Sequence, residues 1–283
     1  MKKLSLKITL IVLLAIGFAT TSCSNEADGD TSANEIDLKT AESEAEIDNI
    51  SDETSSIIED AFLTEETIEP KSNATYRYLP DCVTITATIQ QNLKNVTIDF
   101  GDGCELRNGN TVKGIITIQY EIDASALTKT ITYAYDDFYF NDNLVEGGGS
   151  IFREWLNSNG NPQSTKTFDI KVTWPSGEYA SKTGTRIKEW VEGSNTLVWG
   201  DNVFLITGNW SFTKFDGTVL AVEVKEALRR EWSCRFFVSG LVQISKNDNI
   251  ADLDYGDGEC DDLATVSING GEPTEIHLSN FRK

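Results

Sequence analysis

The chain has 283 residues, of which 45 are Asp or Glu and 24 are Lys or Arg, so its formal net charge is −21 at pH 7. So acidic a chain repels the phosphates of nucleic acids and the headgroups of anionic lipids, which excludes both as electrostatic partners. It holds five cysteines and one histidine, few enough for each to be considered individually.

The first 22 residues have the pattern of a signal peptide. Basic residues precede an apolar run over residues 8–19, and the small residues 20–22 lead directly to Cys23. This run is too short for a membrane-spanning helix, which needs about 20 apolar residues, so a cleaved secretion signal is expected. Residues 20–23 resemble a lipobox, which implies cleavage before Cys23 and attachment of a lipid such as palmitate to Cys23. The alternative is an ordinary secretion signal that ends near a cysteine.

Residues 23–72 form an acidic spacer. Between residues 24 and 72 there are 16 Asp or Glu and two Lys, and residues 24–30 resemble the acid-rich export signal of Bacteroidetes-type surface lipoproteins. High charge and few aromatic residues leave too little apolar surface to offset the entropy of ordering the backbone. We therefore expect a mostly disordered spacer with one short helix near residues 52–63, where Ser51 can cap a turn and apolar residues recur at helical spacing.

From residue 73 to residue 283 the pattern becomes that of β-strands. All six tryptophans and all eight tyrosines lie in this part. Apolar and polar residues alternate in stretches of strand length, at 83–89, 96–100, 115–118, 130–133 and 220–224. Turn dipeptides separate them, at 108–109, 159–160, 176–177, 216–217 and 269–271. No helix-length apolar stripe interrupts the series, so neighbouring strands are expected to pair antiparallel.

Glycines recur inside these strand patterns, at residues 114, 147, 184, 208 and 240. Glycine within a strand often marks a bulge or a bend. The sequence therefore predicts an all-β domain over residues 73–283, built as an antiparallel meander of long hairpins. Because more than about ten strands rarely stay in an open flat sheet, we expect the meander to curl into a sandwich or a wide barrel.

Four cysteines lie in the β region, and their spacing favours two of the possible disulfides. We expect Cys82 to pair with Cys104 and Cys234 with Cys260, because the midpoint of each pair falls in a turn-like stretch. The segments before Cys104 and Cys260 are also alike, Phe-Gly-Asp-Gly and Tyr-Gly-Asp-Gly-Glu, which suggests one hairpin unit used twice. Disulfides persist in exported proteins, and no Cys-x-x-Cys pair or nearby histidine fits zinc.

The second of these hairpins also carries acidic residues that could suggest calcium. Asp252, Asp254 and Asp257 crowd together, and hard cations take oxygen ligands. Their spacing does not match an EF-hand loop, and Asp-Gly is a common hairpin turn. Turn chemistry is therefore the preferred interpretation, and we expect no metal and no cofactor.

No catalytic motif stands out. His277 is the single histidine and lies in a short alternating stretch, and no nucleophile elbow, zinc-binding helix or phosphate loop occurs. Glycoside hydrolysis requires only two carboxylates, and Glu154 and Glu189 each precede a tryptophan, Trp155 and Trp190. These two tryptophans are candidate ligand-facing aromatics. The alternative is that strand alternation buries the tryptophan and exposes the neighbouring charge.

The lipobox, the acidic spacer and the paired Phe/Tyr-Gly-Asp-Gly-Cys endings are together similar to those of Bacteroidetes-type lipoproteins. That resemblance implies a lipid anchor in the outer membrane with display on the cell surface, a periplasm-facing anchor being the alternative. It implies no activity. We expect a non-enzymatic module that binds a glycan or a protein partner; the alternatives are a carbohydrate-active hydrolase on a β-sandwich and a purely structural envelope component.

Overall fold

A computed structural model of the chain describes residues 36–66, 79–123, 127–196 and 198–281. The expected signal peptide, Cys23 and part of the spacer lie outside these residues. The elements within the described ranges are α1 (Leu38–Glu66), β1 (Thr84–Gln90), β2 (Leu93–Asp99), β3 (Cys104–Glu105), β4 (Thr111–Glu121), β5 (Thr128–Phe140), β6 (Asn143–Glu154), β7 (Gln163–Thr173), β8 (Tyr179–Glu192), η1 (Trp199–Asp201), β9 (Val203–Thr213), β10 (Val219–Glu231), β11 (Phe237–Lys246), β12 (Asn249–Asp257), β13 (Leu263–Ile268), β14 (Thr274–His277) and η2 (Leu278–Phe281).

The strands form one antiparallel sheet. Each pairs with its neighbours in chain order from β1 to β14, except that β2 pairs with β4 and the short β3 pairs only with β4. The hairpin turns fall at the dipeptides that the sequence indicates, for example at residues 176–177 and 216–217. The predicted antiparallel meander of long hairpins is therefore confirmed.

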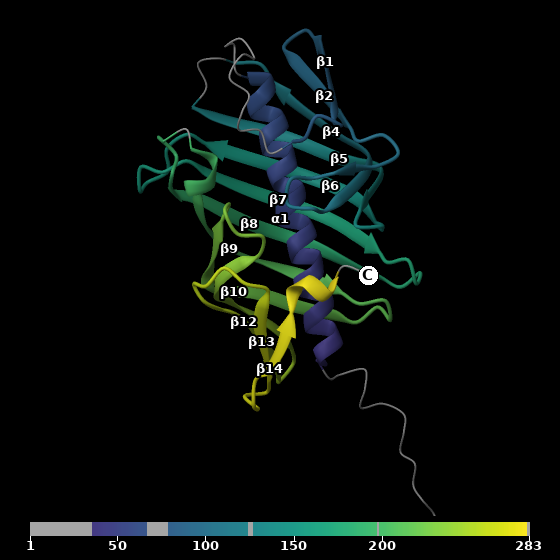
Figure 1. Cartoon of the computed structure of the whole chain (residues 1–283), viewed down its shortest axis with the longest axis vertical. Helices are drawn as coiled ribbons and strands as arrows, with labels where there is room; N and C mark the ends of the chain where they lie inside the picture. The colour runs from purple at the N-terminus through teal and green to yellow at the C-terminus, as the bar shows by residue number, and fades with distance from the viewer. Residues whose placement is uncertain (1–35, 67–78, 124–126, 197, 282–283) are drawn as a thin grey trace, which may run out of the picture.

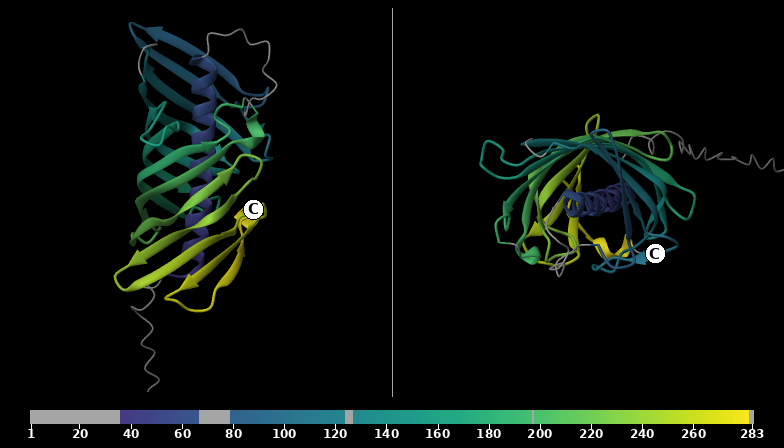
Figure 2. Two further views of the ribbon diagram at one scale, coloured as in Figure 1. Left: turned by 90° about the vertical axis from the view of Figure 1, so that its left-hand side faces the viewer. Right: turned by 90° about the horizontal axis from the view of Figure 1, so that it is seen from above.

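The sheet curls into an arch, and α1 lies on its concave side (Figures 1 and 2). The helix runs across the strands rather than along them, so its length brings it past most of the sheet (Figure 1). The sheet is not closed into a barrel, and β1 and β14 are its two edges. The expected curl is present, and a helix fills the concave side.

Glycine is required where two of the long strands bend. Gly114 has φ +86° and a Cβ there would lie 1.9 Å from the carbonyl oxygen of Asp137, while Gly240 has φ +116° and a Cβ would lie 2.7 Å from that of Ala227. The register shifts at both glycines, as at a β-bulge. Bulges at in-strand glycines are what the glycine pattern predicts.

The acidic segment differs from the expectation. α1 is 29 residues long, and its apolar residues Ile47, Ile57 and Phe62 are buried together with several of its acids. The prediction of a mostly disordered spacer is therefore wrong for residues 38–66, and the expected short helix near 52–63 is only the second half of α1. Contact with the sheet supplies the buried surface that the segment alone lacks.

Buried cations on the sheet neutralise the buried acids of α1. Lys182 on β8 is 0% exposed, and its Nζ lies 3.0 Å from Glu44 Oε1 and also bonds Asp48. Arg186 lies four residues further along β8, on the same face, and donates from its terminal guanidinium nitrogen to Asp48 Oδ1 at 2.5 Å. The indole of Trp210 donates to Glu44 Oε1 at 2.7 Å and lies 3.8 Å below Lys182 Nζ. In this half of the interface, ion pairs therefore accompany the apolar packing of residues such as Ile47.

A second cluster follows along the helix. Arg230 on β10 donates to Asp52 Oδ2 at 3.0 Å and to Glu53 Oε1 at 2.8 Å. Burial by itself would raise the pKa of Asp52, but the positive charges of Lys188 and Arg230 outweigh it and lower that pKa. Asp52 is therefore ionised at neutral pH inside the fold.

Both expected disulfides are present. Cys82–Cys104 brackets the β1–β2 hairpin with a Cα–Cα distance of 5.8 Å, and Cys234–Cys260 brackets the β11–β12 hairpin with a Cα–Cα distance of 5.6 Å. The turns fall after Gln90 and after Lys246, close to the midpoint of each cysteine pair. The interpretation of one hairpin unit used twice agrees with this arrangement.

Candidate ligand-binding pocket

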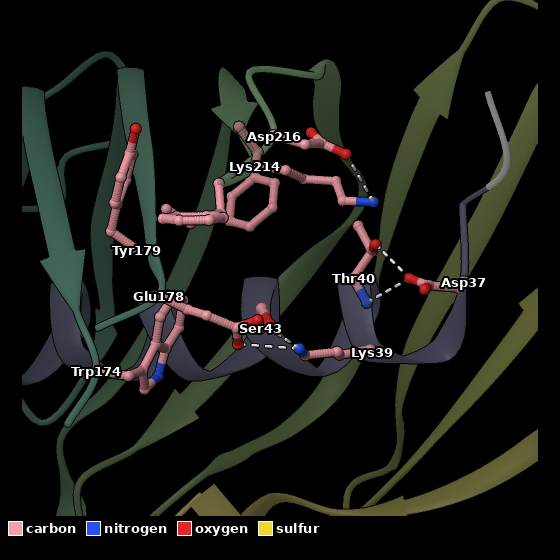
Figure 3. A pocket seen from close by; sticks show the side chains of 12 residues that line it. Asp37, Lys39, Thr40, Ser43, Trp174, Glu178, Tyr179, Lys214 and Asp216 are labelled. Carbon is pink, nitrogen blue, oxygen red and sulfur yellow. Dashed lines mark hydrogen bonds and ion pairs between the residues drawn. The ribbon is translucent and has the colours of Figure 1, made fainter. Parts of the chain in front are cut away.

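A pocket of about 270 Å³ lies where the first turn of α1 meets two neighbouring hairpins, β7–β8 and β9–β10 (Figure 3). Aromatic side chains and oppositely charged pairs share its lining. The residues are Asp37, Lys39, Thr40, Ser43, Trp174, Glu178, Tyr179, Ala180, Phe212, Lys214, Phe215 and Asp216. We refer to it below as the hairpin pocket.

The two hairpins have the same turn geometry. The backbone N–H of Trp174 donates to the carbonyl of Glu178 at 2.9 Å, and that of Lys214 donates to the carbonyl of Thr218 at 2.8 Å. In each turn the backbone N–H of the glycine, Gly177 or Gly217, donates to the carbonyl of the first turn residue, and both glycines have positive φ. Equivalent turns at the ends of adjacent hairpins set their side chains next to each other, which builds one wall of the pocket from each hairpin.

Aromatic rings form the apolar part of the hairpin pocket. Tyr179 and Phe215 meet edge to face, with ring centroids 5.0 Å apart. Phe212 is buried, whereas Phe215 is 56% exposed. The indole N–H of Trp174 donates to Glu46 Oε2 at 2.7 Å, which fixes the orientation of its ring. The pocket therefore has an exposed ring, Phe215, at its rim, and the buried Phe212 and the oriented Trp174 among its other walls.

Charged side chains surround these rings in pairs (Figure 3). Lys39 Nζ lies 2.9 Å from Glu178 Oε2, and Lys214 Nζ lies 4.0 Å from Asp216 Oδ2. Partial burial opposes ionisation of Asp37, but hydrogen bonds from the hydroxyl and the backbone N–H of Thr40 dominate and lower its pKa. The pocket thus presents ammonium donors and carboxylate acceptors whose charges are largely balanced.

One carboxyl group beside the pocket differs from the others. Burial raises the pKa of Glu46 to about 7, although hydrogen bonds from Trp174 and Asn143 oppose that rise. Glu46 lines an adjacent open cleft together with Trp174 and Glu178. Glu46 can therefore hold or release a proton close to neutral pH.

The tryptophans singled out from the sequence lie elsewhere. Trp155 is 53% exposed and lines a small pocket beside Phe62, at the C-terminal end of α1. Trp190 packs against Phe204 with ring centroids 5.5 Å apart. The structure therefore leaves Trp155 as an exposed aromatic and packs Trp190 against a neighbouring ring.

The two candidate carboxylates lie on either side of one strand. Glu154 Oε2 accepts a hydrogen bond from Gln163 Nε2 at 3.1 Å, and Gln163 is opposite Glu189 in the β7–β8 register. Side-chain amides of Asn159 and Asn161 donate to Glu189, and hydrogen bonding with the side chains of Asn157, Asn161 and Asn159 lowers the pKa of Glu189. Neither carboxylate lines the hairpin pocket.

The three acidic residues considered for calcium lie on β12, where each has a partner within the sheet. Asp254 Oδ1 accepts from the backbone N–H of Gly256 at 2.9 Å, and Asp252 Oδ1 accepts from Gln243 at 2.9 Å. Within the described ranges, no group of three or more His, Cys, Asp or Glu is arranged to hold an ion. Asp257 is paired with Ser239 in the sheet register. The geometry around Asp254 is that of an Asx turn, as the sequence favours.

The residues of the hairpin pocket were not identified from the sequence. Two signals were available, since Trp174-Pro-Ser-Gly and Lys214-Phe-Asp-Gly are equivalent turn sequences, each with an aromatic residue, in two successive hairpins. The third wall could not be foreseen, because Asp37 and Lys39 belong to a segment expected to be disordered.

Comparison with known proteins identifies no relative. No family model matches the chain, and no curated protein and no solved structure matches it. In the part of the chain that the structure describes, no helix is both long enough and apolar enough to cross a membrane.

Proposed function

We propose that this chain is a lipid-anchored protein of the cell envelope, displayed at the outer membrane, whose β domain binds a neutral glycan in the hairpin pocket. The observation that carries the proposal is the combination of Trp174, Tyr179 and Phe215 with balanced charged pairs in one cavity. Ligand pockets are typically apolar and aromatic with a few convergent polar groups.

A glycan suits this chemistry better than an ion or an apolar ligand. A sugar ring has apolar C–H faces that can rest on aromatic rings, and hydroxyl groups that both donate and accept hydrogen bonds. Lys39 supplies donors, while Glu178 and Asp216 supply acceptors. Because these charges already have partners, a charged ligand would have to displace an ion pair. A volume of about 270 Å³ matches a short part of a longer glycan.

Binding can be tested with a panel of neutral oligosaccharides by titration calorimetry. We expect the double substitution Tyr179→Ala/Phe215→Ala to weaken binding of a recognised oligosaccharide by about five- to 150-fold, because loss of two stacking partners costs on the order of 1–3 kcal/mol. Phe215 is largely exposed, so the variant should fold, which circular dichroism verifies.

The matched control is Trp155→Ala, which removes an aromatic of similar exposure, 53% against 56% for Phe215. This control should leave affinity unchanged. If Trp155→Ala abolishes binding while the double variant does not, the ligand site is the small pocket beside Phe62 and the hairpin-pocket proposal is wrong. Failure of the whole panel to bind would also count against it.

The anchor is proposed from the sequence pattern around Cys23. Cells grown with radiolabelled palmitate should label the native chain, whereas Cys23→Ser should abolish the label because its hydroxyl does not replace the acylated thiol. Protease treatment of intact cells distinguishes surface display from a periplasm-facing anchor: a surface protein is cleaved. Persistence of the label in Cys23→Ser would overturn the anchor without affecting the glycan proposal.

A hydrolase that acts in the cleft beside the hairpin pocket is the second candidate, and Glu46 favours it. A carboxyl group with a pKa of about 7 can act as a general acid at neutral pH, and the carboxylate of Glu178 lines the same cleft. Incubation with the bound oligosaccharide separates the two functions. A binding module returns the oligosaccharide intact, whereas a hydrolase releases shorter products.

A further inference from the structure

The two edges of the open sheet differ in composition. β14 has four residues, carries Glu275 and His277, and continues into η2, features that discourage pairing with another chain. β1 has seven residues, Thr-Ile-Thr-Ala-Thr-Ile-Gln, with neither a charge nor a proline. Within residues 36–66, 79–123, 127–196 and 198–281, no strand pairs with the outer edge of β1.

The β1–β2 register shows which backbone groups of β1 face outward. The hairpin closes through a two-residue turn, with Gln90 opposite Leu93. In such a hairpin the pair next to the turn exchanges two hydrogen bonds, and every second residue does the same. Thr84, Thr86, Thr88 and Gln90 therefore bond β2, and the backbone N–H and C=O groups of residues 85, 87 and 89 point away from the sheet.

The five central residues of β1, 85–89 (Ile-Thr-Ala-Thr-Ile), are symmetric about Ala87. We propose that β1 pairs antiparallel with β1 of a second copy of this chain, giving a two-fold symmetric dimer with one continuous sheet. With the axis at Ala87, Ile85 of one copy lies opposite Ile89 of the other, and Thr86 lies opposite Thr88. The outward backbone groups of residues 85, 87 and 89 are then the ones that exchange hydrogen bonds in this register.

Side-chain pairing supports the same register. Ile85 and Ala87 lie opposite Ile98 and Val96, which are both buried, so this face of β1 continues the apolar concave side. Ile89, on the same face, is 61% exposed. In the dimer each Ile89 packs beside an Ile85, and threonines pair with threonines on the other face. β-Branched cross-strand pairs of this kind stabilise antiparallel sheets, and an isologous contact closes at two copies.

The first test measures mass by sedimentation of the full lipidated chain in detergent. We expect twice the protomer mass for the native chain, and the protomer mass for Ala87→Lys, because the two-fold axis would place the new ammonium groups opposite each other. Ala87 is exposed, so the substitution should not disturb the monomer. Thr128→Lys, at an exposed position of β5, is the control for added charge and should remain dimeric.

The second test is cross-linking in intact cells. Ala87→Cys places two cysteines opposite each other at about 5.5 Å between Cα atoms, within the range for a disulfide, so oxidation should give a covalent dimer. Gln90→Cys is the control, since its two copies would lie six residues apart along the strand, on the order of 20 Å. Both variants keep the same Cys23.

The outcomes are decisive in either direction. A monomeric native chain, a dimeric Ala87→Lys chain, or cross-linking at residue 90 rather than at residue 87 would each overturn the proposal. The dimer does not involve the hairpin pocket, so glycan binding can fail while the dimer stands, and the reverse also holds.

Discussion

Lys182 illustrates, at the scale of one residue, how this fold keeps charge in its interior. The side chain is fully buried and contacts two carboxylates and an indole ring at once. A buried ion pair contributes little net stability compared with apolar packing, because both charges lose their hydration. Removing one partner is different, since the remaining charge is then buried without compensation.

We therefore expect Lys182→Met to lower the free energy of unfolding by about 3–5 kcal/mol, measured by chemical denaturation. Adding Glu44→Gln to this variant should recover part of the loss, because Glu44 loses the cation that pairs with it, whereas Asp48 keeps Arg186.

Lys171→Met is the matched control, because its ion pair with Glu146 is exposed and such pairs contribute about 0–1 kcal/mol. Equal losses for Lys182→Met and Lys171→Met would show that the buried network does not hold the helix in place.

At the scale of the secondary-structure element, the sequence predicts the strands much better than it predicts the helix. The hairpins were predictable because their signals are local: alternation, turn dipeptides and in-strand glycines such as Gly114 each act on adjacent residues. The disulfides were predictable for the same reason, since each pair closes one hairpin.

The helix was not predictable in this way because its partners are far away in the chain. Glu44 and Asp48 meet Lys182 and Arg186 across separations of more than 130 residues, and buried acids give no apolar periodicity. One signal was nevertheless present, since residues 182, 186 and 188 put three cations on one face of β8, and that face is buried. Basic residues in phase with strand alternation indicate an acidic partner.

The hairpin pocket depends both on local sequence signals and on contacts between residues far apart in the chain. Trp174 and Phe215 follow from local turn chemistry, whereas Lys39 reaches Glu178 only because α1 docks. A pocket whose third wall comes from a docked helix can be located only once the helix is placed.

At the scale of the whole molecule, α1 holds the arch together. It crosses the strands on the concave side and bonds β8 and β10 near its middle and β5 near its C-terminal end. A curled sheet with an apolar concave face would otherwise expose that face to water. The helix is thus part of the core and not an accessory to it.

This arrangement makes a prediction for amide hydrogen exchange in the native chain. Amides in the buried middle of α1, around Asp48 and Asp52, should open with the same free energy as amides in the central strand β8. Both values should match the global free energy of unfolding, because neither set of amides can be exposed without separating the helix from the sheet. The short edge strand β14 should exchange faster and serves as the internal reference. If α1 exchanges much faster than β8, the helix undocks as an independent unit and the sheet keeps its curl without it.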